Sequence, residues 1–288
     1  MAGHDDRLTG DGAEVLTSLH TGSIRHTNVA TDVGAARAAG FDGIELQIPK
    51  LARYLDAGYS VGSLRDMLDG LRVTMIDVLM PIEAEGDPMP DRLLAECERW
   101  STVAGDLACP AIQVVALNNF ASMHWDEQRD VLVRRLTAMS DLTSTRGVRL
   151  GIEPVSFSPF RTLKQAVEVV DRVGLDRVGI VLDVWHLWTA GCDWADVAGL
   201  DPELVVCVQL GDTAPRSGEV WTDDDRTELL GDGILPLGDA ITAVRSTGFD
   251  GVWSVEMLSK RHWEWDPYAL AGELHDRLVA YVPDRYGD

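Results

Sequence analysis

Eight short apolar segments recur along the chain, and their number and spacing constrain the fold more than any other feature of the sequence. They are residues 14–20, 43–48, 73–80, 111–117, 148–155, 178–185, 204–210 and 251–258. Near-continuous runs of β-branched and other apolar residues are typical of strands whose two faces are both covered. The intervening stretches, such as residues 93–108, carry apolar residues at helical spacing and are too long for hairpin loops. The sequence therefore predicts a repeated strand and helix unit.

Glycine residues mark the ends of several predicted helices. Gly40, Gly147, Gly174 and Gly248 each lie just before the next apolar segment, where a helix that ends in a left-handed conformation requires glycine. Eight strand and helix units close naturally into a parallel barrel, although open doubly wound sheets share the same local pattern. The number of strands favours the closed form, so the predicted fold is α/β, a (β/α)8 TIM barrel.

The length and composition of the chain fit a single domain. Its 288 residues, of which 45% are apolar, can bury one large core, and barrels of roughly 250 residues commonly form one unit. We expect the barrel domain to span residues 13–282, with a flexible N-terminal tail at 1–12 and a C-terminal tail at 283–288. The longest interruption, residues 211–236, is rich in Gly, Pro and Asp and is interpreted as a functional loop after the seventh strand.

The net charge of -22, from 47 acidic and 25 basic residues, argues against two classes of partner. Such a surface repels phosphate backbones and anionic bilayers, so neither nucleic acid nor a membrane is an expected partner. The first ten residues are polar, and no run approaches the ~20 apolar residues of a membrane span. The four cysteines form no CxxC pair and are interpreted as reduced. Together these features predict a cytoplasmic protein.

Side chains that can bind a metal stand at the ends of four consecutive predicted strands. Glu153, Asp183, Gln209 and Glu256 end the fifth to eighth apolar segments, and barrel enzymes carry their active sites at these strand ends. Buried carboxylates need a common cation, which predicts a divalent metal. A site made of oxygen donors suits Mn2+ best, with Mg2+ or Co2+ as alternatives, rather than a structural zinc. Any single acid could instead be an ion-pair partner at the rim or a helix cap.

The motifs around these positions resemble those of a known family. GFDGIEL, GIEPV, LDVWH, VQLGD, LLGDGILPL and SVEML span nearly the whole chain and resemble the xylose isomerase-like barrel family, the sugar phosphate isomerases and epimerases. The resemblance implies a metal set of Glu, Asp, His and Glu, which maps onto Glu153, Asp183, Gln209 and Glu256. Gln209 departs from the histidine usual in the epimerases, and in this respect the chain resembles the 3-dehydroshikimate dehydratase branch.

The resemblance also implies a mechanism and its catalytic residues. A divalent metal would hold a carbonyl and a neighbouring hydroxyl of the substrate and stabilise the enediolate formed on proton loss. Glu153 and Glu256 would take and return the proton, and His186, which follows Asp183 in a DxxH pattern, would contact a substrate oxygen. Epimerisation, aldose–ketose isomerisation and β-elimination share this enediolate. The residues therefore constrain the first half of the reaction better than the second.

Five further residues are candidates for substrate binding. His20 and Glu45 lie on the first two predicted strands and are expected to point into the barrel mouth. Asp212 and Arg216 follow the seventh strand, and Arg216 matches an arginine that contacts the substrate in the epimerases that this chain resembles. Trp185 could stack on the C–H face of a sugar or pack in the rim. The predicted partner is a small carbohydrate or hydroxyketone, and the resemblance is also compatible with a homo-oligomer.

The leading function is therefore a divalent-metal-dependent isomerase or epimerase of a sugar or sugar phosphate. Gln209 keeps a metal-dependent dehydratase, or another β-eliminating lyase, as the nearest alternative. Enzymes that cut DNA at abasic sites share the barrel, but their histidine-rich zinc sites and basic surfaces differ from this acidic chain with seven scattered histidines. A non-catalytic sugar-binding barrel is a third alternative, against which the presence of both Glu153 and Glu256 argues.

Overall fold

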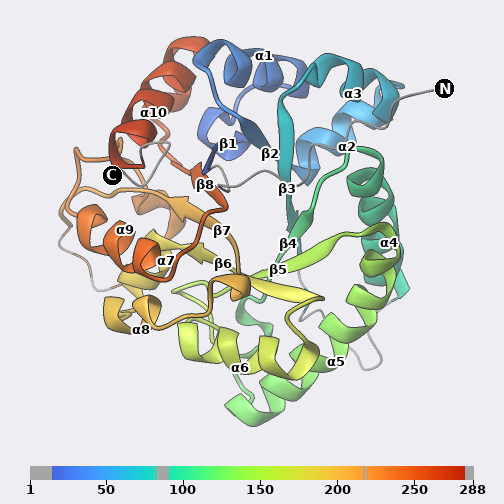
Figure 1. Ribbon diagram of the computed structural model, residues 1–288, viewed down its shortest axis with the longest axis vertical. Helices are drawn as coiled ribbons and strands as arrows, with labels where there is room; N and C mark the ends of the chain where they lie inside the picture. The colour runs from blue at the N-terminus through green and yellow to red at the C-terminus, as the bar shows by residue number, and fades with distance from the viewer. Residues whose placement is uncertain (1–14, 81, 83–90, 217, 219, 283–288) are drawn as a thin grey trace.

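The computed structural model describes residues 15–80, 82, 91–216, 218 and 220–282, and its centre is a closed barrel of eight parallel strands (Figure 1). The strands are β1 (Leu16–His20), β2 (Gly43–Gln47), β3 (Arg72–Leu79), β4 (Ala111–Val115), β5 (Arg149–Glu153), β6 (Val178–Asp183), β7 (Val205–Leu210) and β8 (Val252–Val255). Each strand pairs with its neighbours in chain order, and β8 pairs with β1 to close the ring. The predicted (β/α)8 TIM barrel is confirmed. The tails predicted at 1–12 and 283–288 lie outside the described residues.

Helices form an outer layer around the barrel (Figure 1). They are α1 (Val29–Ala39), α2 (Ile48–Asp56), α3 (Val61–Leu68), α4 (Asp91–Asp106), α5 (Trp125–Thr143), α6 (Leu163–Val173), α7 (Val184–Thr189), α8 (Trp194–Ala198), α9 (Leu237–Ser246) and α10 (Pro267–Tyr281). Among the shorter 3-10 turns are η1 (Thr21–Ile24) after β1 and η5 (Asp223–Asp225) in the loop after β7. In the described ranges, no helix combines the length and the apolar character that crossing a bilayer requires.

The carboxylate at the end of β6 stops the strand and starts a helix. Residues 184 and 185 belong to a predicted strand segment, but the structure has them in α7. The reason is that Asp183 occupies the N-cap of α7, where its Oδ1 accepts the main-chain N–H of His186 at 2.9 Å. A carboxylate at this position satisfies a free N–H group and favours helix initiation. The Asp183 side chain is therefore held at the barrel mouth by the helix that it caps.

A polar layer begins inside the barrel next to a small apolar cluster. Met75, Ala111, Val181 and Cys207 form this cluster, and they come from four different strands, as expected for side chains that fill a barrel interior. The thiol of Cys207 donates to Oε1 of Glu45 at 3.2 Å. The strands thus carry apolar side chains at one level and hydrogen-bonded polar ones at the next.

A buried lysine fixes the segment that follows β1. Lys50 on α2 is only 4% exposed, and its ammonium donates to the main-chain oxygens of Thr21 and Ile24 and to the hydroxyl of Thr27 at 2.9 to 3.0 Å. It also pairs with the buried Asp32 of α1 at 3.1 Å. A buried ammonium with four oxygen partners thus ties η1, α1 and α2 together.

Replacing Lys50 by Met tests the contribution of this buried pair. The substitution leaves the carboxylate of Asp32 and the loop acceptors without their donor, and breaking a buried ion pair from one side costs ~3–5 kcal/mol. We expect the free energy of unfolding, measured by urea denaturation, to fall by this order. The same change at the exposed Lys164 is the matched control and should alter it by less than ~0.5 kcal/mol. Equal losses at the two sites would show that the pair contributes nothing specific.

Candidate active site

A cavity of about 280 Å³ opens at the C-terminal ends of the strands. Its ionisable lining includes Asp77, Glu153, His186, Asp223, Arg226 and Glu256, and apolar side chains such as Phe157 complete the wall. A larger cavity of about 350 Å³ lies beside α2, but its described lining holds no carboxylate. Convergent ionisable groups at this end of a barrel mark the expected place of catalysis. We therefore take the mouth cavity as the candidate active site.

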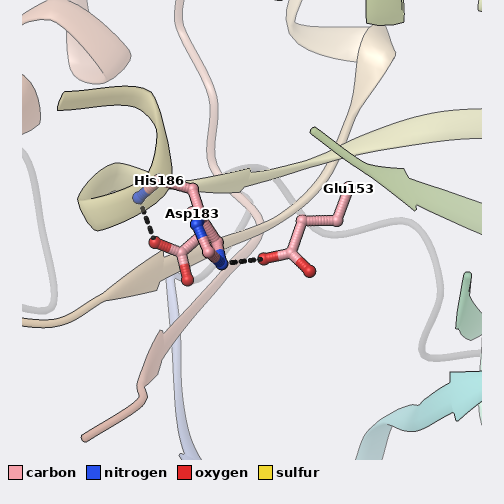
Figure 2. A group of neighbouring side chains, drawn as sticks. All are labelled: Glu153, Asp183 and His186. Atoms are coloured by element: carbon pink, nitrogen blue, oxygen red, sulfur yellow. Dashed lines mark hydrogen bonds and ion pairs between the residues drawn. The ribbon is translucent and has the colours of Figure 1, made fainter. Parts of the chain in front are cut away.

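Glu153, Asp183 and His186 lie together at the mouth (Figure 2). One ligand-capable atom from each lies within 4.8 Å of the other two. Glu153 and Asp183 end the adjacent strands β5 and β6, and His186 is in the first turn of α7. Oε1 of Glu153 is 3.8 Å from Nε2 of His186. The local fold thus brings two carboxylates and one imidazole to a single point.

His186 is a neutral ring with a defined proton position. Its Nδ1 accepts the main-chain N–H of Ser156 at 3.3 Å and lies 3.2 Å from the hydroxyl of the same residue. Burial lowers the pKa of His186 to about 3, although the nearby carboxylate of Asp183 opposes this shift. Because Nδ1 is an acceptor, the proton of the neutral ring is on Nε2. His186 therefore presents a hydrogen-bond donor on the side of Glu153.

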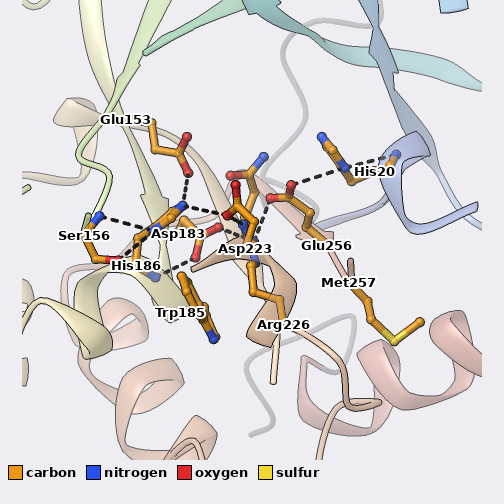
Figure 3. Close-up of polar contacts among 12 residues, drawn as sticks. His20, Glu153, Ser156, Asp183, Trp185, His186, Asp223, Arg226, Glu256 and Met257 are labelled. Atoms are coloured by element: carbon orange, nitrogen blue, oxygen red, sulfur yellow. Dashed lines mark hydrogen bonds and ion pairs between the residues drawn. The ribbon is translucent and has the colours of Figure 1, made fainter. Parts of the chain in front are cut away.

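Arg226 provides a buried cation that the sequence analysis did not single out. Its guanidinium Nη2 donates to Oδ2 of Asp183 and to Oε2 of Glu256, the latter at 2.8 Å (Figure 3). The group lies over the ring of Trp185, with Cζ 5.3 Å from the ring centroid. Burial alone would lower the pKa of Arg226, but Asp183 and Glu256 raise it above its usual value. One permanent positive charge thus bridges the carboxylates at the ends of β6 and β8.

Burial and neighbouring charges separate the three acids by protonation. Burial raises the pKa of Glu153 well above its usual range, and the carboxylates of Asp183 and Glu256 raise it further. Burial also raises the pKa of Glu256, to about 7, although Arg226 opposes the shift. For Asp183 the effect of burial is outweighed by Arg226, so its pKa lies below the usual value. Asp183 is the permanent anion, and Glu256, with its pKa of about 7, can bind or release a proton near neutral pH, whereas the raised pKa of Glu153 favours its protonated form.

His20, at the end of β1, joins two of the acids. Its Nε2 is 2.6 Å from Oδ2 of Asp77, and its Nδ1 is 3.6 Å from Oε1 of Glu256 (Figure 3). The main-chain N–H of Gly22, 3.2 Å from Nδ1, favours the neutral ring. Burial also lowers the pKa of His20, but Glu256 and Asp77 prevail and raise it to about 10. The two carboxylates thus favour a proton on His20, whereas the Gly22 contact at Nδ1 favours the neutral ring.

Gln209 contributes an oxygen that has no protein partner. It pairs with Asp183 in the register of β6 and β7, and its side-chain nitrogen donates to Glu45 and Gln113. Its Oε1 is buried and finds no hydrogen-bond donor in the described part of the chain. A buried carbonyl oxygen without a donor is unfavourable, and a bound cation would relieve the cost.

The donors at the mouth are of types that bind a divalent cation. Glu153, Asp183 and His186 each bring one ligand-capable atom within reach of a common ion. Glu256, which lies outside this group, and the unpartnered amide oxygen of Gln209 are further oxygen donors, and oxygen donors suit hard or borderline ions. Arg226 holds one oxygen each of Asp183 and Glu256, so a cation would share these carboxylates with the guanidinium.

None of the five residues predicted to bind substrate belongs to the described lining of the mouth cavity. Glu45 is fully buried and accepts hydrogen bonds from two side chains of β7. Trp185 is fully buried and supports the guanidinium of Arg226. His20 is buried against Asp77. His20 and Trp185 thus support groups that line the cavity, whereas the two partners of Glu45 lie outside its described lining.

Asp212 and Arg216, the other two, organise the loop after β7. The oxygens of Asp212 accept main-chain N–H groups of residues 213, 231, 233 and 235 at 2.8 to 3.1 Å. Arg216 pairs with Asp225 at 2.6 Å, and its Cζ lies 5.1 Å from the ring centroid of Trp221. The polar groups of Asp212 and Arg216 thus bind partners within the loop and hold its conformation. The arginine of this loop that lines the cavity is Arg226.

Two residues of the cavity lining that the sequence analysis did not single out are nevertheless recognisable from the sequence. Asp77 and Gln113 are polar residues inside apolar strand segments, and both line the cavity. A polar side chain in such a segment needs a buried partner, which is a reason to expect a site. Arg226 follows a run of three aspartates in the long loop, and its local sequence does not distinguish it from Arg216.

The pKa of His20 predicts a pH dependence of stability. Because the folded pKa of about 10 exceeds the unfolded value of 6.5, the contribution of His20 is complete below pH 6.5 and is lost as the pH rises through 10. We expect the difference in free energy of unfolding between the wild type and His20→Asn to shrink from pH ~6 to ~9, by at most ~1.4 kcal/mol per pH unit. Urea denaturation with a metal chelator measures it, and the exposed His124→Asn is the control. A difference independent of pH would show that the ring is neutral.

Comparison with known proteins places these observations in a family context. A family model described as "Xylose isomerase-like TIM barrel" matches residues 33–279. Inosose isomerase of Halalkalibacterium halodurans is 23% identical over 269 residues, which cover 92% of this chain and 95% of that protein. 3-Dehydroshikimate dehydratase of Pseudomonas aeruginosa is 26% identical over 228 residues, which cover 78% of this chain and 35% of that protein.

A solved structure shows the same fold. The crystal structure of the IolI protein with a binding zinc atom has a TM-score of 0.88 with this chain at 22% sequence identity. The match covers 95% of this chain and 100% of that one. The likeness therefore shows that the two chains share the barrel fold.

Proposed function

Because the chain belongs to the xylose isomerase-like TIM barrel family, we propose that it is a divalent-metal-dependent isomerase or epimerase of a sugar, a sugar phosphate or a related hydroxyketone. One observation carries the proposal: Glu153 and Glu256, both with raised pKa values, line one cavity with the neutral His186. The inosose isomerase that matches 92% of this chain supports the reaction class. Inosose is therefore the first substrate to test.

The proposed metal ligands are Glu153, Asp183, Gln209 and Glu256. A divalent cation held there would polarise a substrate carbonyl and make the adjacent proton easier to remove. The unpartnered Oε1 of Gln209 supports this assignment. Mn2+ is the proposed ion because the donors are oxygens, and zinc is the ion to test beside it because the related IolI structure holds zinc.

Glu153 and Glu256 are the proposed acid and base. They enter the mouth from β5 and from the end of β8, on different sides of the site (Figure 3). A carboxyl group with a pKa near the working pH can both take and return a proton. Return of the proton to the opposite face of the same carbon gives an epimer. Return to the neighbouring carbon gives an aldose–ketose isomer.

Arg226 and His186 are the proposed donors to substrate oxygen. Both line the cavity, and both are fixed before a substrate arrives, Arg226 by Asp183 and Glu256 and His186 by Ser156. Donors held in place stabilise the negative charge that develops on a carbonyl oxygen as the adjacent proton leaves. Arg226 takes the role that the sequence analysis gave to Arg216.

A metal-dependent dehydratase is the second candidate function. Gln209 stands where the epimerases usually have histidine, and the 3-dehydroshikimate dehydratase of Pseudomonas aeruginosa matches 78% of this chain. Abstraction of a proton by Glu153 or Glu256 would start either reaction. The outcome then depends on whether the site expels a β-hydroxyl or returns the proton. A non-catalytic sugar-binding barrel is the remote third candidate.

Two substrates separate the two leading candidates. The purified protein, loaded with Mn2+ or with Zn2+, is incubated in deuterated water with inosose and separately with 3-dehydroshikimate. We expect deuterium uptake into inosose and formation of an isomer by NMR. Elimination from 3-dehydroshikimate would extend conjugation and change the ultraviolet absorbance, which would assign the lyase reaction instead. If the protein acts on neither compound nor on a panel of ketose sugars and their phosphates, the proposed function is wrong.

Replacing either carboxyl group by an amide tests the proton transfer. Glu153→Gln and Glu256→Gln each remove a group that binds and releases a proton, and loss of general acid–base catalysis costs ~10²–10⁴ in rate. We expect the rate of deuterium exchange to fall by this order in each variant. Glu98→Gln, at an exposed position of α4, is the matched control and should keep the wild-type rate. Full exchange activity in both variants would remove these residues from the mechanism.

A further inference from the structure

Four buried polar side chains form a continuous hydrogen-bonded chain across the barrel interior. Nε2 of Gln209 donates to Oε2 of Glu45 at 2.9 Å and to Oε1 of Gln113 at 3.2 Å. Nε2 of Gln113 then donates to Oε2 of Glu153 at 2.8 Å. The residues come from β2, β7, β4 and β5, and none is more than 4% exposed. We call Glu45, Gln209, Gln113 and Glu153 the amide relay.

The carboxylate of Glu45 fixes the direction of both amides. A primary amide has two N–H donors, and Gln209 uses its nitrogen for Glu45 and Gln113. The oxygen of Gln113 is thereby the acceptor, and its nitrogen faces Glu153. Turning over Gln209 would set its oxygen against the carboxylate of Glu45, and turning over Gln113 would set its nitrogen against the nitrogen of Gln209; both are costly where water is excluded. The relay therefore has one favoured arrangement.

This arrangement divides the two oxygens of Glu153. Oε2 is held by Gln113, whereas Oε1 lies 3.8 Å from Nε2 of His186. Gln113 therefore sets the rotation of the carboxyl group about its last bond. At the other end, the same direction leaves Oε1 of Gln209 as the oxygen without a protein donor in the described residues.

We infer that Gln113 and Gln209 are positioning residues, which transmit the fixed orientation of Glu45 to the carboxyl group of Glu153 and aim its Oε1 at the reacting carbon of the substrate. The inference rests on the proposed function, because Glu153 is there the acid or base. It gives a role to Glu45, which lies outside the cavity lining, and to the polar side chain in the middle of β4. Orientation of a catalytic group by buried partners is worth ~10- to 100-fold in activity at comparable sites.

A direct contact between Gln113 and the substrate is the competing explanation, because Gln113 also lines the cavity. The two roles differ in their kinetics. Loss of a substrate contact present throughout the reaction raises KM and leaves kcat unchanged. Loss of a positioning residue lowers kcat, because the substrate still binds but the carboxyl group is poorly aimed.

The first test is Gln113→Leu in the metal-loaded, full-length protein, with inosose as the probe. We expect kcat to fall ~10- to 100-fold while KM stays within about twofold. Gln128→Leu is the matched control, because Gln128 is also a buried glutamine but donates to the main-chain oxygens of Phe120 and Met123, outside the cavity lining. A rise in KM with unchanged kcat would overturn the inference. An equal fall of kcat in the control would also overturn it.

The second test asks whether the distant end of the relay acts through Gln113. Glu45→Gln removes the anion that fixes the direction of the amides, so kcat should fall in an otherwise wild-type chain. In a Gln113→Leu background the same change should cause no further fall, because the path to Glu153 is already broken. Independent effects of the two substitutions would instead multiply, and that result would contradict the relay.

The third test does not depend on turnover. In a crystal structure of Gln113→Leu, the relay predicts that the carboxyl group of Glu153 rotates away from the orientation that it has in the wild-type protein. An unchanged carboxyl orientation in a folded variant would show that Gln113 does not position it. Thermal unfolding confirms that the variant is folded. A wild-type protein that is inactive on every probe would refute the proposed function, whereas this structural result would still decide the relay.

Discussion

The candidate active site depends on the compensation of buried charge. Glu153, Asp183 and Glu256 lie at the ends of strongly apolar strands, where an isolated carboxylate is very unfavourable. Arg226, itself 2% exposed, brings the compensating charge from the loop after β7 and bridges Asp183 and Glu256. One guanidinium therefore holds together the ends of two strands and the loop that covers them. The same guanidinium lowers the pKa of Asp183 and keeps it ionised beside the two glutamates, whose pKa values burial raises.

The strands and the segments that follow them supply different residues of the candidate site. The strands bring the acids and the two glutamines to neighbouring heights, because parallel strands in a closed barrel end on the same face. The loop after β7 brings Arg226, and the start of α7 brings His186. The strand residues are rigid and suit the proton transfer of the proposed function. The loop residues contribute to the walls of the cavity, where selection among substrates is expected under that proposal.

The sequence predicted the strands and their end residues well because both follow from local pattern. Apolar runs, helical periodicity and glycine helix ends are properties of short segments, and Glu153, Asp183 and Glu256 stand at the ends of such runs. The path of the long loop is not a local property. Asp212 fastens that loop and Arg216 pairs within it, so these two predicted substrate contacts lie outside the cavity lining while Arg226 lies in it. Only the three-dimensional course of the loop distinguishes the two arginines.

The bridge between Arg226 and the two carboxylates has a consequence for the life of the protein in a cell. Since the guanidinium places a positive charge between the two carboxylates, the mouth can fold without a bound cation. Under the proposed function, ion uptake would then be an event in the finished molecule, and a shortage of the ion would leave an intact reserve of inactive protein.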